Sequence, residues 1–182
     1  MRIIFLRHAE TRVESHVPSS EWSLSTAGQH SAEKLAETGV FDDIDSIVSS
    51  DEKKALQTAE PFCARLELEP IEEQLFRELD RGSVNLPSSE EYSNVVRWAL
   101  TDLDTKYFDW ETARSALNRV QVGVLRIENG FKENTVLVVS HGIVLSLFFA
   151  NRLGELDKVY ERWVELDFLD YGIVMDGLVT RD

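Results

Sequence analysis

The chain is poor in cysteine, in basic residues and in long apolar runs. Its one cysteine, Cys63, excludes an intrachain disulfide, so a reducing compartment, the cytoplasm, is expected. With 19 lysine and arginine residues against 33 aspartate and glutamate residues, the formal net charge of −14 argues against nucleic acid and against anionic membranes as partners. No repeat or low-complexity tract interrupts the sequence, which predicts a single domain over residues 1–182.

Neither the N-terminus nor the most apolar stretch of the sequence has the features of a signal peptide or a transmembrane helix. The N-terminus enters a strand-like run after two residues, without the long apolar core and cleavage site of a signal peptide. Residues 135–150 are apolar but too short for a transmembrane helix. His141, Gly142 and Ser146 interrupt them, so a strand followed by a helix is the better interpretation.

Apolar runs and capping residues predict an alternation of strands and helices. Strands are expected at residues 2–6, 44–48, 70–71, 135–139, 164–169 and 173–179. Helices are expected at about 26–35 after a Thr26–Gln29 capping box, to about 66 after the N-cap residues 49–51, and at about 90–100, 111–128 and 143–153. This order predicts an α/β fold with a largely parallel sheet that helices cover on both faces.

Two histidines each follow a predicted strand, and ligands bind at the carboxyl ends of strands in open α/β sheets. Neutral imidazole can attack phosphorus, and the planar guanidinium of Arg7, beside His8, matches phosphate oxygens. Alternatives remain: Arg7 and His8 could form a surface pair, and His141 could be a core histidine. His16 and His30 are expected at the surface, and the four histidines show no metal-ligand spacing.

Five blocks of sequence, taken together and in order, resemble motifs of the histidine phosphatase superfamily, also called phosphoglycerate mutase-like. The blocks are Leu6-Arg7-His8-Ala9-Glu10-Thr11, Leu24-Ser25-Thr26-Ala27-Gly28, residues 49–59 (SSDEKKALQTA), Glu78-Leu79-Asp80-Arg81-Gly82 and Val139-Ser140-His141-Gly142. The resemblance implies a three-layer α/β/α sandwich with a small cap insertion at about residues 80–117. It also implies a two-step reaction through a phosphohistidine.

By matching position, the resemblance assigns a role to each site residue. His8 would be the nucleophile, Glu78 the proton donor, and Arg7, Lys54, His141 and Gly142 would surround the phosphoryl group. The chemistry agrees, because phosphoryl transfer depends on positioning and on cations around the phosphoryl oxygens, and a poor leaving group needs a general acid. Protein cations supply the charge, so no metal or other cofactor is expected. A solvated surface carboxylate is the alternative for Glu78.

The sequence departs from the family pattern in two single residues and one loop. Ala9 replaces a glycine, which is harmless if the backbone there has negative φ. Lys54 stands where the family has arginine; it keeps the charge and loses the bidentate fork. Val13 and Glu14 stand where many relatives have Trp-Asn, and a carboxylate there would repel phosphate, which predicts a different path for this loop.

The predicted cap bears on the choice of substrate. It holds four basic residues against seven acidic ones, and a bisphosphoglycerate pocket would need more cations, so a phosphatase is favoured over a mutase. Its aromatic residues favour an apolar cap, although packing is the alternative; they are Tyr92, Trp98, Tyr107, Phe108 and Trp110. The expected substrate is a small phosphomonoester or a phosphoprotein. A phosphoglycerate-type mutase and a weakly active or inactive phospho-ligand binding module remain alternatives to test. A homodimer is also possible.

Overall fold

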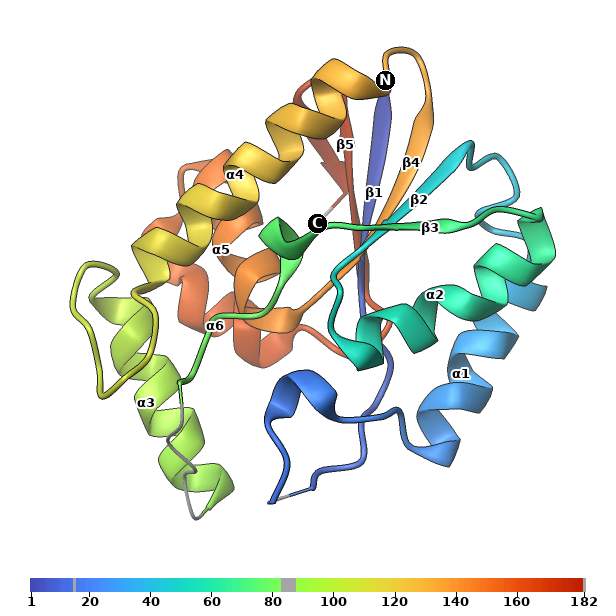
Figure 1. Cartoon of the computed structure of the whole chain (residues 1–182). Helices are drawn as coiled ribbons and strands as arrows, with labels where there is room; N and C mark the ends of the chain where they lie inside the picture. Colours follow the sequence, from blue (N-terminus) through green and yellow to red (C-terminus); the bar gives the residue numbers. More distant parts are fainter. Residues whose placement is uncertain (15, 83–87, 182) are drawn as a thin grey trace.

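A mixed sheet runs through the middle of the molecule, with helices on both of its faces (Figure 1). The computed structural model describes residues 1–14, 16–82 and 88–181. The strands are β1 (Arg2–Arg7), β2 (Ser46–Ser49), β3 (Pro70–Glu72), β4 (Thr135–Ser140), β5 (Tyr171–Met175) and β6 (Leu178–Arg181). The α-helices are α1 (Thr26–Glu37), α2 (Lys53–Leu66), α3 (Ser89–Thr101), α4 (Ala113–Gly130), α5 (Gly142–Leu153) and α6 (Val159–Glu165). Short 3-10 turns cover Ser19–Glu21, Gln74–Phe76 and Leu156–Lys158.

The strand order is β3-β2-β4-β1-β5-β6. The first four strands of this order are parallel, as the sequence predicts. Strand β5 runs antiparallel to β1, and β6 runs antiparallel to β5. In the register of β1 with β4, Arg7 lies opposite Ser140, so both strands end at the same level. The two predicted histidine turns therefore start side by side.

The C-terminal part of the secondary-structure prediction is wrong in two places. Residues 164–169 are not a strand: α6 ends there and a turn follows, because Leu169 has a φ of 63°. The predicted strand 173–179 is a hairpin of β5 and β6 instead. Asp176 and Gly177 form its turn with positive φ, and an Asp-Gly pair favours such a hairpin turn.

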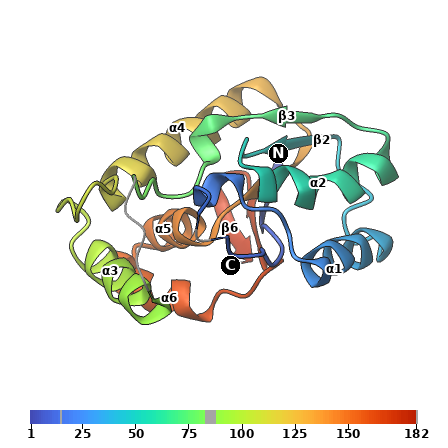
Figure 2. The ribbon, with the colours of Figure 1, turned by 60° about the horizontal axis from the view of Figure 1, so that its bottom comes forward.

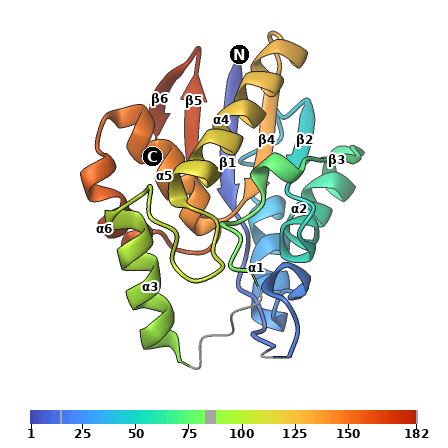
Figure 3. The ribbon, with the colours of Figure 1, turned by 60° about the vertical axis from the view of Figure 1, so that its left-hand side comes forward.

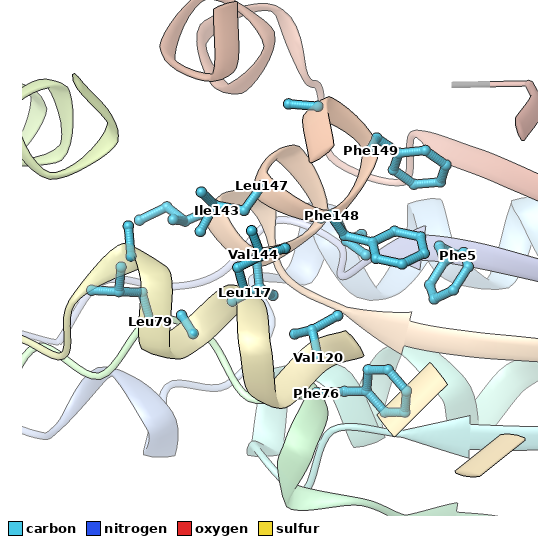
Figure 4. Packing of buried hydrophobic residues seen from close by; sticks show 14 of the residues in the cluster. Phe5, Phe76, Leu79, Leu117, Val120, Ile143, Val144, Leu147, Phe148 and Phe149 are labelled. Atoms are coloured by element: carbon cyan, nitrogen blue, oxygen red, sulfur yellow. The ribbon is translucent and has the colours of Figure 1, made fainter. Parts of the chain in front are cut away.

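Alternate residues of each strand face opposite helical layers, which gives the three-layer sandwich that the sequence predicts. On one face, Ile3, Phe5, Val136 and Val138 pack with α4 and α5. Figure 4 shows Phe5 beside Phe148 of α5. On the other face, Ile4, Leu6, Leu137 and Val139 pack with α1 and α2. The near-continuous apolar sequences of β1 and β4 follow from burial on both faces.

Two helices have other N-cap residues than predicted. Ser25, not Thr26, caps α1, and its hydroxyl accepts a hydrogen bond from the Gly28 amide. In α2 the N-cap is Glu52, without a side-chain cap. The predicted caps Ser50 and Asp51 have other partners, since Ser50 contacts His141 and Asp51 pairs with Arg77.

The predicted cap at residues 80–117 includes residues 83–87, which lie outside the described residues. Helix α3 packs against α6 (Figure 3). Of the cap aromatics, Trp110 is fully buried, and Tyr92 and Tyr107 pack against the core. Trp98 and Phe108 remain about half exposed. Within the described part of the chain, no helix is long and apolar enough to cross a membrane.

Candidate active site

The two predicted histidines meet at the carboxyl edge of β1 and β4. Their ring centroids lie 5.1 Å apart, and the amide of His8 donates to the carbonyl of Ser140 at 2.9 Å. Figure 2 views this edge, where the blue loop after β1 lies beside α2 and α5. The adjacent parallel strands thus bring together two residues that are far apart in the sequence.

His8 is buried and held in one tautomer. Its Nδ1 lies 2.7 Å from the carbonyl oxygen of Ala9, and because a carbonyl only accepts, Nδ1 carries the proton. The Nε2 lone pair is then the nucleophilic atom. Burial, with the neighbouring His141 and Lys54, holds the pKa of His8 well below its ordinary value, so the imidazole is neutral near pH 7.

The loop after β1 is fastened to α2 by two side chains of the block 49–59. The Ala9 amide donates to Thr58 Oγ1, and the Leu24 amide donates to Gln57 Oε1. Ala9 is fully buried and is not among the residues with positive φ, so this departure from the family pattern is harmless, as expected. Thr58 thus positions the residue that follows His8, and Gln57 holds the loop at Leu24; sequence reasoning missed both roles.

Arg7 lies over the start of α5. A Cβ atom on Gly142 would lie 3.2 Å from its Cζ, so a glycine permits this close approach. The guanidinium stacks on Phe168 at 4.4 Å and donates through Nη1 to the carbonyl of Leu166. Its Nε is buried and has no hydrogen-bond partner in the described part of the chain. The segment wrongly predicted as a strand therefore holds Arg7.

His141 is completely buried. Its Nε2 lies 2.8 Å from Ser50 Oγ, while its Nδ1 has no partner among the described residues. Burial, with the positive charges of Lys54 and Arg119, holds the pKa of His141 well below its ordinary value. Its packing is that of a core histidine, yet its ring lies beside His8.

Glu78 projects toward the N-terminus of α5 and is not a solvated surface carboxylate. Its oxygens accept hydrogen bonds from the amides of Ile143 at 3.1 Å and Val144 at 3.2 Å. Arg119 bonds the Glu78 carbonyl and fixes this segment of the chain. These contacts fix the side chain of Glu78 at the start of α5.

Lys54 is buried at the same edge, not exposed on the far side of α2. Its ammonium pairs with Glu52 and donates to the carbonyl of Ser19 at 2.8 Å. Glu52 Oε1 accepts the Glu78 amide at 2.8 Å and lies 3.7 Å from His141 Nε2. Sequence reasoning assigned no role to Glu52, which lies two positions before Lys54.

Tyr92 and Arg81 lie at the mouth of the site. The Arg81 guanidinium is 5.1 Å from the Tyr92 ring centroid and 5.7 Å from that of Trp22. Burial raises the pKa of Tyr92 to about 12, and charges on Arg81 and Glu78 also act on its hydroxyl. Tyr92 thus contributes to both the packing of the cap and the site.

Glu14 makes its contacts with neighbouring residues of its own loop. Glu14 pairs with Arg12 at 2.7 Å, and its carbonyl accepts the indole N–H of Trp22. Val13 is 69% exposed. The charge of Glu14 is therefore compensated locally.

No metal-binding cluster of described side chains marks this site, and neither His8 nor His141 lines the cavity behind Arg7. Among residues 1–14, 16–82 and 88–181, no group of three or more His, Cys, Asp or Glu side chains is placed to hold a metal ion. A cavity of about 570 Å³ lies between α5, α6 and β5, behind the segment that holds Arg7. Leu166 and Asp170 line it, and their carbonyls bond Arg7.

The three-layer fold with paired histidines at its carboxyl edge is that of the phosphoglycerate mutase-like proteins. Residues 3–167 match the family model of the histidine phosphatase superfamily (branch 1), and the chain belongs to this family. The resemblance stated from the five sequence blocks is confirmed.

Named relatives are phosphatases. Phosphoserine phosphatase 1 of Hydrogenobacter thermophilus is 27% identical over 169 residues, which cover 88% of this chain and 80% of that protein. A mycobacterial glucosyl-3-phosphoglycerate phosphatase in complex with VO3 superposes with a TM-score of 0.81 at 20% identity and covers 100% of this chain and 96% of that chain. A phosphoserine phosphatase from Entamoeba histolytica gives 0.78 at 18% identity, with 99% and 94% covered. At these identities, the solved structures establish the fold.

Proposed function

We propose that this protein is a phosphatase that hydrolyses a phosphomonoester through a phosphohistidine intermediate on His8. Membership of the histidine phosphatase superfamily and the phosphoserine phosphatase relative support a phosphoric monoester hydrolase. The geometry adds a neutral, buried imidazole whose Nε2 lone pair is available for attack.

One observation carries the proposal: two buried nitrogen atoms beside His8 have no hydrogen-bond partner among the residues that the structure describes. They are Arg7 Nε, which is a donor, and His141 Nδ1. When the Ser50 hydroxyl donates to His141 Nε2, Nδ1 carries the proton and becomes a donor too. A buried donor without an acceptor costs about 1–3 kcal/mol, and phosphoryl oxygens would satisfy both nitrogens.

In the first step, His8 Nε2 attacks phosphorus and the bond to the substrate oxygen breaks. Arg7, His141, the Gly142 amide and Lys54 surround the phosphoryl oxygens, and Glu78 protonates the leaving oxygen. This donor is worth about 10²–10⁴ in rate for a poor leaving group.

In the second step, the Glu78 carboxylate takes a proton from water, and the resulting hydroxide attacks the phosphohistidine. The N–P bond breaks, orthophosphate leaves, and His8 and Glu78 return to their starting states. No cofactor enters either step.

The substrate class that the relatives support best is a small phosphomonoester, since their printed names refer to phosphoserine and glucosyl-3-phosphoglycerate. A phosphoprotein substrate, a cytoplasmic location and a homodimer stay predictions from the sequence.

Trapping the intermediate tests the proposal. The protein is mixed with an aryl phosphate, quenched in alkali and digested, and mass spectrometry locates phosphate; phosphorylation of the peptide with His8 is expected. His30→Ala serves as control, because His30 is an exposed histidine on α1. Product analysis separates the mutase alternative, which yields an isomerised monophosphate where a phosphatase yields free orthophosphate. Turnover without phosphate on His8 would refute the proposal.

A further inference from the structure

Glu52 is a buried carboxylate that the proposed reaction does not use. Its side chain is 7% exposed, and it contacts three members of the site. Its carboxylate pairs with the Lys54 ammonium, accepts the Glu78 amide at 2.8 Å, and lies 3.7 Å from His141 Nε2.

A negative charge is unexpected at this place. A site for a phosphoryl dianion gains affinity from uncompensated cations, and Lys54 is the cation that α2 contributes. Lys54 and Glu52 are both almost fully buried, at 5% and 7% exposure, so solvent screens their interaction little. The pair carries no net charge.

We propose that Glu52 is a specificity-determining residue that compensates Lys54 and keeps the affinity of the site for the phosphate group itself low. This inference rests on the proposed function. Recognition then depends more on the non-phosphate part of the substrate, and the orthophosphate product leaves readily. Arg7 remains the cation whose guanidinium has a buried N–H without a partner in the described structure.

Three variants change the charge of the pair in steps. Glu52→Gln leaves a net charge of +1 and keeps an acceptor for the Glu78 amide. Lys54→Met leaves −1. The double variant leaves zero and replaces a buried pair without stranding a charge, so it is expected to fold even where a single variant does not.

Orthophosphate binding by calorimetry is the main measurement. We expect Glu52→Gln to bind orthophosphate at least about tenfold more tightly than the unaltered protein, and Lys54→Met at least about tenfold more weakly. The double variant should stay within about threefold of the unaltered protein. For a small aryl phosphate, Glu52→Gln should lower KM more than it changes kcat.

Two results would overturn the inference. One is unchanged or weaker orthophosphate binding by folded Glu52→Gln, as a purely structural role predicts. The other is a loss of affinity of tenfold or more in the double variant, which would show that Glu52 does not offset the contribution of Lys54 to phosphate affinity.

The failure of this inference is distinct from the failure of the proposed function. If His8 is phosphorylated during turnover and the three affinities do not follow the charge, only the role of Glu52 is wrong. If His8 is never phosphorylated, the proposed function is wrong, whatever the affinities.

Discussion

The proposed active site has two halves of different character. The strand half, at the ends of β1 and β4, consists of Arg7, His8 and His141, and its histidines are neutral and buried. The helix half, at the start of α2, consists of Ser50, Glu52 and Lys54 and contains a charged pair. The strand half follows the family pattern, whereas the helix half departs from it.

The difference follows from how each half is held. In the strand half, the ladder of β1 and β4 ends at Arg7 and Ser140, directly before each histidine, so a small change in either strand would displace His8, the proposed nucleophile. In the helix half, side chains reach the site from the first turn of a helix, where a substitution can be compensated by a neighbour. Glu52 is such a neighbour for Lys54. Chemistry is therefore expected to reside in the strand half and affinity in the helix half.

The largest effect is expected from His8→Ala. Because binding alone cannot replace a nucleophile, kcat should fall by at least about 10³-fold. Steady-state kinetics on an aryl phosphate measures the loss, circular dichroism verifies the fold, and His30→Ala is the control. If His8→Ala retained more than a tenth of the original activity, His8 would not be the nucleophile and the chemistry would not reside in the strand half.

The second-largest effect is expected from Glu78→Gln, which should lower kcat by about 10²-fold or more and change KM little. The loss should be greater for an alkyl phosphate than for a nitrophenyl phosphate, because the better leaving group needs less protonation. Both substrates are compared with the same enzyme preparations. Equal losses for both would remove Glu78 from the role of acid.

Lys54→Arg tests whether the helix half is shaped around a lysine. Lys54 is buried between Glu52 and the Ser19 carbonyl, so the larger guanidinium should fit poorly and kcat/KM for an aryl phosphate should fall several-fold. A several-fold rise would instead indicate that lysine is only a poorer phosphate clamp than arginine.

The smallest effect concerns stability and pH. The folded-state pKa values of His8 and His141 lie below the unfolded value, so the unfolded chain binds more protons and the free energy of unfolding falls as pH drops below about 6.5. Each histidine contributes up to about 1.4 kcal/mol per pH unit. Urea unfolding at pH 7, 6 and 5 should show a shallower decline for His141→Asn than for His30→Ala, and equal slopes would contradict the assignment.

The strand half could be predicted because its signals are local. An apolar run that ends in a histidine indicates both the strand and the point at which the strand ends. The resemblance of the same two blocks also assigns Arg7 and Gly142 to the site. The register that brings His8 to His141 needs only adjacent parallel strands. Glu78 was identified by its block alone, since its amide partners belong to α5.

The remaining contacts depend on tertiary structure. Val164, Leu166 and Phe168 alternate with polar residues as in a strand. Only the structure, with the positive φ of Leu169 and the packing of Phe168 on Arg7, shows that this segment is a turn that holds Arg7. Glu52 could not be assigned for a similar reason. Its contact with Lys54 depends on the residue at which α2 begins, and the sequence places this start too early.

The central place of β1 in the sheet has a consequence for synthesis. Its partners are β4, at residues 135–140, and β5, at residues 171–175, so neither hydrogen-bonding edge of β1 can be filled until most of the chain has left the ribosome. Such distant pairing makes folding slow and leaves an apolar strand exposed meanwhile. His8 must wait for the same event, because its backbone bond to Ser140 forms only then. A nascent chain would thus acquire its nucleophile late, in one step with its central strand.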